Sequence, residues 1–222
     1  MSSPIKRIPG WINNLDFYNP GTPIAVLSKK LGLNEEKIVK LASNENSFGC
    51  STKVSECINT NLSDLHRYPD GNCSELKDEL CKFYEINPNQ IIVGNGSNDV
   101  LDCVARTFLY KGVSSVYSQH SFAVYNLATV STGAESVIIP TENDLGHDLK
   151  GFLAGIKTNT NVIFIANPNN PTGTFIGENK IRQFLESINS SILVVLDEAY
   201  HEYLDDTLKI NSIKLLKDFP NL

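Results

Sequence analysis

Short apolar runs, mostly of β-branched residues, recur from residue 91 onward, and polar residues and then an amphipathic stretch follow most of them. We interpret these runs as strands, at residues 91–93, 115–117, 137–139, 162–166 and 192–196. Most of them are continuously apolar, which is typical of strands that a parallel sheet buries on both faces. Strands that alternate with helices favour an α/β fold, in which helices flank a mostly parallel sheet.

Apolar residues spaced three or four positions apart predict the helices. They are expected near residues 23–31 and 52–62, from residues 72, 97 and 121, and at 149–156 and 178–188. Ser97 has a side chain favoured at helix N-caps, and we predict that it caps the helix after residues 91–93. Residues 1 to about 22 contain turn residues without a helical or strand period, so we expect an irregular arm there.

The charge of the chain limits its partners. Its 222 residues carry a formal net charge of −6 and contain no basic run, which argues against nucleic acid and anionic membranes. No apolar segment is long enough to span a membrane, and the N-terminus lacks the apolar core of a secretion signal. The five cysteines form no CxxC pair, and the four histidines show no metal-ligand spacing. We therefore expect a cytoplasmic protein with reduced cysteines and no metal site.

The most distinctive loop follows residues 162–166 and reads NPNNPTG. Its two prolines fix φ and hold the asparagines before them in extended geometry, which makes the loop rigid. Open α/β sheets bind ligands at the carboxyl ends of their strands, and there the amide of Asn170 would both donate and accept hydrogen bonds. Considered alone, such a loop is more often a stiff strand-to-helix turn without a ligand.

A second strand end carries a candidate phosphate site. After residues 91–93, the sequence GNGSND opens a helix, so the N–H groups of Ser97 and Asn98 would lie at its positive end and suit a phosphate. A tight turn is the alternative for this loop. Asp99 stands where the dinucleotide fingerprint has its third glycine, which argues against a nucleotide site.

A third strand end carries a carboxylate. Asp197 follows the apolar residues 192–196 directly, and Tyr200 comes three residues later. A lone aspartate there is often a helix cap or an ion-pair partner, but a desolvated carboxylate favours a cation opposite it, such as a protonated pyridine nitrogen. Tyr200 would bond a ring hydroxyl. Phe122 offers a flat face for stacking, although an aromatic residue at such a position is more often part of the core. A phosphate, an aromatic ring, a basic ring nitrogen and a phenolic oxygen together describe pyridoxal phosphate.

From about residue 8 to its last residue, the chain resembles fold-type I pyridoxal-phosphate aminotransferases of class I and II, and most closely the histidinol-phosphate aminotransferase family. The landmarks are LASNENSFG at 41–49, RYPDG at 67–71, GNGSND at 94–99, HSFAVYNLAT at 120–129, ANPNNPTGT at 166–174 and VVLDEAY at 194–200. The resemblance implies a homodimer that exchanges an amino group between L-histidinol phosphate and 2-oxoglutarate, with imidazole acetol phosphate and glutamate as products, in histidine biosynthesis.

The resemblance also assigns roles to residues, all of them in contact with the cofactor or the substrate. The cofactor phosphate would be held by Gly96, Ser97, Asn98 and Tyr68 of the partner subunit. The cofactor ring would stack on Phe122, its phenolic oxygen would bond Asn170 and Tyr200, and its nitrogen would stay protonated beside Asp197. The substrate pocket would be lined by Tyr18, Asn44, Glu45 and Asn46. Asp197 and Tyr200 are the candidate catalytic residues.

By the same resemblance, residues 1–40 form an N-terminal arm and helix that associate with a small C-terminal domain, and residues 41–222 form an incomplete cofactor-binding large domain. The Schiff-base lysine and the small domain would follow Leu222. We therefore expect an N-terminal portion of an enzyme that is inactive alone. Two strands of the family's sheet would lie between residues 91–93 and 192–196, so we expect two unpaired apolar edges and a chain that is poorly soluble or partly molten.

A substitute lysine would have to come from the end of the chain. The candidates are Lys209, Lys214 and Lys217. They flank apolar residues in what is predicted to be an amphipathic surface helix, which favours solvated charges instead.

Three alternative functions stay open. An aromatic amino-acid aminotransferase or a threonine-phosphate decarboxylase would share the cofactor chemistry. A non-catalytic protein that binds the cofactor or a homologous subunit without turnover is favoured by the missing lysine. A nucleotide-binding α/β protein is disfavoured by Asp99.

Overall fold

The computed structural model describes residues 7–15, 18 and 20–222, which belong to two compact units. One unit comprises the described residues of Met1–Asp16 together with Leu80–Leu222, and the other those of Phe17–Glu79. No helix among the described residues is both long and apolar enough to cross a membrane.

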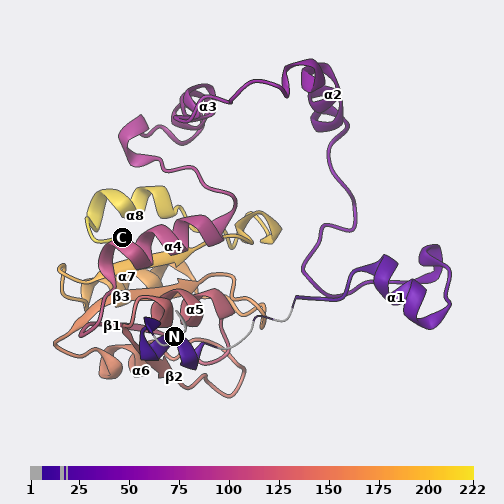
Figure 1. Ribbon diagram of the computed structural model, residues 1–222. Helices are drawn as coiled ribbons and strands as arrows, with labels where there is room; N and C mark the ends of the chain where they lie inside the picture. Colours follow the sequence, from indigo (N-terminus) through magenta and orange to yellow (C-terminus); the bar gives the residue numbers. More distant parts are fainter. Residues whose placement is uncertain (1–6, 16–17, 19) are drawn as a thin grey trace. The chain divides into compact units, whose positions relative to one another are not determined.

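A parallel sheet lies at the centre of the first unit (Figure 1). Its strands in the described part of the chain are β1 (Ser114–Ser118), β2 (Glu135–Ile139), β3 (Thr160–Ala166) and β4 (Leu193–Asp197). They lie in the order β2-β1-β3-β4, and every neighbouring pair is parallel. The mostly parallel sheet predicted from the apolar runs is confirmed.

Helices cover both faces of this sheet. The covering helices are α4 (Ser97–Phe108), α5 (Ala123–Ser131), α6 (Leu149–Gly155), α7 (Glu178–Glu186) and α8 (Ser212–Asp218). Alternate side chains of a strand point to opposite faces. In β3, Ile163 and Ile165 pack with α6, α7 and α8, whereas Phe164 and Ala166 pack with α4 and α5. The continuous apolar run of β3 therefore follows from burial on both sides.

The strand predicted at residues 91–93 is wrong. These residues form no strand, and Ile92 is 73% exposed. A strand needs a neighbour to receive its backbone hydrogen bonds, and none of the described strands lies beside this segment. At the other predicted edge, β4 ends the sheet, but Asn221 covers part of it. Val194 N–H donates to Asn221 O (2.8 Å), and Asn221 Nδ2 donates to Ile192 O (2.8 Å).

The described N-terminal residues of the first unit contact α5. They form a 3₁₀ turn, η2 (Gly10–Asn14), and the indole of Trp11 donates to Ser131 O (3.4 Å). The ring lies directly over Gly133, where a Cβ would come within 2.8 Å of it. Gly133 has a φ of +79°, so both the backbone and the close contact require glycine there.

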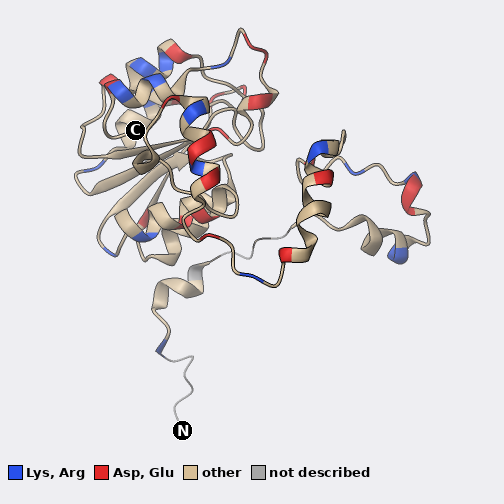
Figure 2. Cartoon of the chain, turned by 90° about the horizontal axis from the view of Figure 1, so that it is seen from above, with Lys and Arg blue, Asp and Glu red and all other residues tan. Residues whose placement is uncertain are grey.

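The second unit contains α1 (Ile24–Leu31), α2 (Thr52–Asn61) and the 3₁₀ turns η3 (Glu35–Lys37) and η4 (Leu62–Asp64). Helix α3 (Ser74–Tyr84) begins in this unit and ends in the first one, where η5 (Pro88–Gln90) and η6 (His201–Tyr203) also lie. None of the described residues of the second unit is buried. Figure 2 shows Lys and Arg scattered among Asp and Glu rather than gathered in one place, in agreement with a chain that has no basic run.

Candidate functional site

Three loops meet at the carboxyl ends of β1, β3 and β4. The side chain of Asn169, after β3, donates from Nδ2 to His120 O (2.7 Å) and accepts from Ser121 Oγ (3.2 Å), both after β1. Asn167 N–H donates to the carbonyl of Asp197 at the end of β4 (2.8 Å). These bonds fix the positions of the three loops relative to one another, as expected for neighbouring parallel strands.

The loop after β3 brings together two residues predicted to share a ligand atom. Asn170 Nδ2 lies 3.3 Å from Tyr200 OH, and it donates to that hydroxyl. The loop is held by the buried side chain of Asn167, which donates to Ile176 O (2.9 Å) and accepts from Ile176 N–H (2.8 Å). Its rigidity thus comes from this pair of bonds as well as from the two prolines.

Asp197 is held by two hydrogen bonds. Its Oδ2 accepts from Tyr125 OH (2.8 Å), and its Oδ1 accepts from Ala199 N–H (3.2 Å). The Tyr125 ring is fully buried, stacks on Phe164 with centroids 5.0 Å apart, and meets Phe122 edge-on at 5.9 Å. Burial, and then the negative charge of Asp197, raise the pKa of Tyr125, so its hydroxyl keeps its proton and acts as the donor.

The predicted phosphate loop lies at the start of α4. Gly96 is the N-cap residue and has a φ of +74°, a conformation that favours glycine. The prediction that Ser97 caps this helix is wrong, because Ser97 is its first residue and no side chain makes a capping bond. The carboxylate of Asp99 instead accepts from Asn95 N–H (2.8 Å) and Asn95 Nδ2 (3.0 Å). The amides of Ser97 and Asn98 lie in the first turn, where a helix leaves its N–H groups without partners.

The remaining predicted site residues lie in the second unit. They are Tyr18, Asn44, Glu45, Asn46 and Tyr68. Glu45 Oε1 lies 2.7 Å from Lys40 Nζ, and Asn46 Oδ1 accepts from Phe48 N–H (3.0 Å). The side chain of Tyr68 is fully exposed. Their roles stay predictions.

The predicted amphipathic helix near residue 222 is confirmed, and two of the three candidate lysines lie on it. Lys214 and Lys217 are exposed on α8, whereas Leu215 between them is buried. Lys209 lies before the helix, and its Nζ lies 2.7 Å from Asp206 Oδ1.

Sequence reasoning missed two residues that hold the site together, Tyr125 and Asn169. Tyr125 follows Phe122 by three residues within the segment HSFAVYNLAT, so the spacing already placed both rings on one side of a helix. Asn169 is one of three asparagines in NPNNPTG, and nothing in the spacing distinguishes the one that contacts the neighbouring loop.

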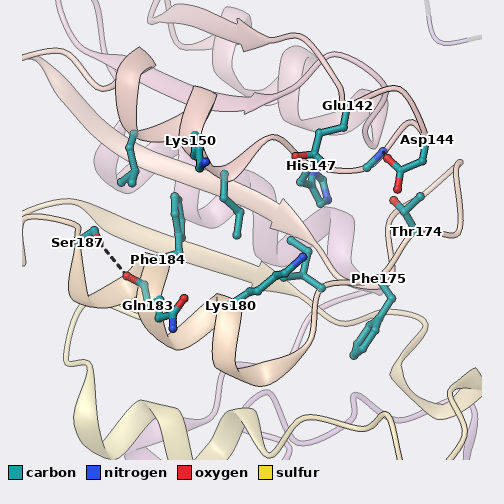
Figure 3. A pocket seen from close by; sticks show the side chains of 14 residues that line it. Glu142, Asp144, His147, Lys150, Thr174, Phe175, Lys180, Gln183, Phe184 and Ser187 are labelled. Atoms are coloured by element: carbon teal, nitrogen blue, oxygen red, sulfur yellow. Dashed lines mark hydrogen bonds between the residues drawn. The ribbon is translucent and has the colours of Figure 1, made fainter.

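A cavity of about 620 Å³ lies elsewhere, between α6 and α7 (Figure 3). Its lining includes Lys150, Lys180, Phe184 and the buried His147, and it contains none of the predicted site residues. Because α6 and α7 cover the sheet face opposite α4 and α5, this cavity is separate from the site around Asp197.

Comparisons with known proteins agree with this arrangement. Residues 36–222 match the family described as aminotransferase class I and II. The chain is 48% identical over 214 residues to histidinol-phosphate aminotransferase 2 of Nitrosospira multiformis, a match that covers 96% of this chain and 54% of that protein. Histidinol-phosphate aminotransferase of Methylobacillus flagellatus is 47% identical over 214 residues, or 96% of this chain and 58% of that protein.

A solved structure shows the same fold. It is the crystal structure of histidinol-phosphate aminotransferase from Sinorhizobium meliloti in complex with pyridoxal-5'-phosphate, with a TM-score of 0.82 and 27% identity over 97% of this chain and 56% of that chain. The chain therefore spans about half the length of the relatives that it matches.

Proposed function

Because the chain belongs to the class I and II aminotransferase family, we propose that residues 41–222 form the cofactor-binding part of an enzyme that transfers an amino group between L-histidinol phosphate and 2-oxoglutarate in histidine biosynthesis. Relatives 46–48% identical to this chain bear the name histidinol-phosphate aminotransferase, which supports this substrate. The observation that carries the proposal is the meeting of an amide, a phenol and an anchored carboxylate at one edge of the sheet. These groups belong to Asn170, Tyr200 and Asp197.

The residues present fit pyridoxal phosphate. Asp197 offers an anion to a protonated ring nitrogen, and the Asn170–Tyr200 pair offers donors to a phenolic oxygen. Phe122 is half-buried beside Tyr125 and would cover one face of the ring. The first turn of α4 suits the phosphate, because its amides and the helix dipole both favour an anion.

When bound, pyridoxal phosphate supplies a ring that accepts the electron pair released as a substrate loses its Cα proton. The protein's part in this chemistry is binding and electrostatics. Asp197 would keep a proton at the ring nitrogen, because a carboxylate fixed by two hydrogen bonds favours a cation opposite it. Asn170 and Tyr200 orient the ring through its phenolic oxygen, and Phe122 keeps water from one face.

We further propose a homodimer, in which Tyr68 of the partner subunit contacts the cofactor phosphate. The full exposure of the Tyr68 side chain supports this, since the group is available to another chain. Residues 1–40 are proposed to associate with a small C-terminal domain. The five cysteines are free thiols, which supports the proposal of a cytoplasmic location.

Deletion of the gene in its source organism tests the substrate. We expect a requirement for histidine that histidinol relieves and L-histidinol phosphate synthesis from glutamate that disappears from extracts. Growth without histidine, or a requirement for another aromatic amino acid, would instead support the alternative aminotransferases. Cofactor binding is tested separately, by dialysis of the purified chain with pyridoxal phosphate, where Asn170→Ala should weaken binding by about tenfold, the effect of one or two lost hydrogen bonds.

A further inference from the structure

The bond between Tyr125 and Asp197 joins two parts of the chain that are 72 residues apart. Tyr125 lies on α5 with a relative exposure of 0%, and Asp197 is the last residue of β4. The phenol cannot turn away, because its ring is stacked on Phe164 with an interplanar angle of 6° and is packed edge-on by Phe122. The ring of Tyr125 is therefore held rigidly, and its O–H donates to one carboxylate oxygen of Asp197.

The hydrogen bond from Tyr125 affects how the Asp197 carboxylate can bind a ligand. A hydrogen bond to the charged form of an acid stabilises that form. Asp197 also accepts from the backbone of Ala199 on its other oxygen, so each oxygen has one donor inside the protein and keeps a lone pair for a ligand. The Tyr125 hydroxyl cannot itself take a proton from a ligand, because burial and the nearby charge raise its pKa and it stays protonated.

We propose that Tyr125 is a positioning residue for Asp197, whose carboxylate it orients toward a basic ring nitrogen of the bound ligand. This inference rests on the proposed function and deepens it. It makes the ligand preference of the site depend on a residue that need not touch the ligand. The contribution of Tyr125 should then exist only for ligands that have a basic nitrogen in the ring.

Two ligands separate this role from general support of the fold. The first is pyridoxal phosphate, and the second is its carbocyclic analogue, in which a C–H group replaces the ring nitrogen. Both present the same phosphate, aldehyde and phenolic oxygen, so the ratio of their dissociation constants isolates the interaction with Asp197. We expect the purified protein to prefer pyridoxal phosphate.

In Tyr125→Phe, the affinity for pyridoxal phosphate should fall about tenfold, or about 1.4 kcal/mol, as for one lost hydrogen bond to a charged group. The affinity for the analogue should change less than about twofold. The matched control is Tyr117→Phe, because Tyr117 is also a buried tyrosine, lies 6.2 Å from Tyr125 between ring centroids, and donates to Asn126 rather than to Asp197. In Tyr117→Phe, the ratio of the two dissociation constants should equal that of the unmodified protein.

Equal losses for both ligands in Tyr125→Phe, or no loss for either, would overturn the positioning role. If the unmodified protein does not distinguish the two ligands, the assignment of Asp197 to the ring nitrogen fails as well, which is the failure of the proposed function.

The single variant removes one partner of a buried bond and could unfold the chain, so a second comparison is needed. Asp197→Asn should abolish the preference, and adding Tyr125→Phe to it should change the ratio no further. A further loss in the double variant would overturn the proposal.

Discussion

At the scale of single residues, His147 connects two strand ends of the site. Its Nε2 lies 2.8 Å from Ala166 O at the end of β3, and its Nδ1 lies 2.6 Å from Ser118 Oγ at the end of β1. A carbonyl only accepts, so the ring carries its proton on Nε2 and accepts from the serine on Nδ1. The neutral ring therefore satisfies both neighbours within a buried position.

We expect this histidine to make the fold sensitive to acid. Burial lowers the pKa of His147 from its ordinary value of 6.5, so the unfolded chain binds a proton that the folded chain does not. The free energy of unfolding should fall as the pH drops below about 6.5. His147→Gln should be less stable at pH 7 by about 1–3 kcal/mol, since a buried bond is lost, but should lose less stability between pH 7 and pH 5.

Urea unfolding at several pH values measures this difference. The control is His120→Gln, which changes an exposed histidine in the same unit. Burial also raises the pKa of Glu198, which opposes the effect of His147, but this contribution is present in both proteins and cancels in the comparison. An identical pH slope in His147→Gln and the unmodified chain would contradict the prediction.

Some residues of the candidate site could be predicted from the sequence, and others could not. Asp197 follows an apolar run directly, and Asn170 and Tyr200 lie in the loops after such runs, so their positions beyond strand ends indicated them. Tyr125 and His147 lie within or beside helices, where a buried aromatic residue or histidine looks like core. Their roles depend on contacts with residues far away in the sequence. The spacing of apolar residues predicts local elements and gives no information about such contacts.

At the scale of elements, α8 is attached mainly by one side chain. Leu215 has a relative exposure of 0% and belongs to the cluster that contains Phe184 of α7 and Val194 of β4. Leu216 beside it is only half-buried. An ion pair between Arg182 Nη1 and Asp218 Oδ2 (2.8 Å) adds little, because both side chains are partly exposed.

Leu215→Ala should therefore lower the free energy of unfolding by about 2–5 kcal/mol, because it removes buried methyl groups and leaves a cavity. Leu216→Ala should cost clearly less, and it controls for the loss of a leucine from the same helix. Urea denaturation followed by circular dichroism measures both. Equal losses in the two variants would mean that α8 does not dock through Leu215.

Element prediction succeeded where local pattern and tertiary partners agree. The run at residues 162–166 became the doubly buried β3, and the run at 192–196 became β4, shifted by one residue. Residues 91–93 have the same β-branched composition but no neighbouring strand in the described part of the chain, so they form no ladder. Composition indicates which segments can be strands, and a partner decides which of them are.

At the scale of the whole molecule, the two units differ in how they are stabilised. The first has apolar clusters on both faces of its sheet, whereas the described residues of the second include no buried side chain. The helices of the second unit are also short, with 8 residues in α1 and 10 in α2. Isolated helices of this length are only marginally stable in water, because the free-energy cost of nucleating the first turn exceeds the stabilisation from a few backbone hydrogen bonds.

We therefore expect the backbone amides of residues 20–79 to exchange with deuterium far faster than those of β1 and β3. Hydrogen exchange followed by mass spectrometry of peptides measures this, and unfolding in urea gives the fully exchanged reference. Helix α4, which packs on the same sheet, controls for helical amides in general. Comparable protection in α2 and α4 would show that the second unit has a stability of its own.

The same exposure predicts association of the chain. The second unit presents large apolar side chains to solvent, including Leu41 at 93% and Phe48 at 95% exposure, and the first unit ends its sheet at β4, which Asn221 covers only in part. Exposed apolar patches and open strand edges both favour association with other chains.

We expect sedimentation velocity to show species larger than a monomer, and their proportion should grow with protein concentration. Replacing Leu41 and Phe48 with serine should reduce that growth if the second unit causes it, whereas Val195→Lys should reduce it if the edge of the sheet does. A monomer at all concentrations, with one cooperative thermal transition, would contradict the prediction, because it would mean that these apolar groups find partners within a single chain.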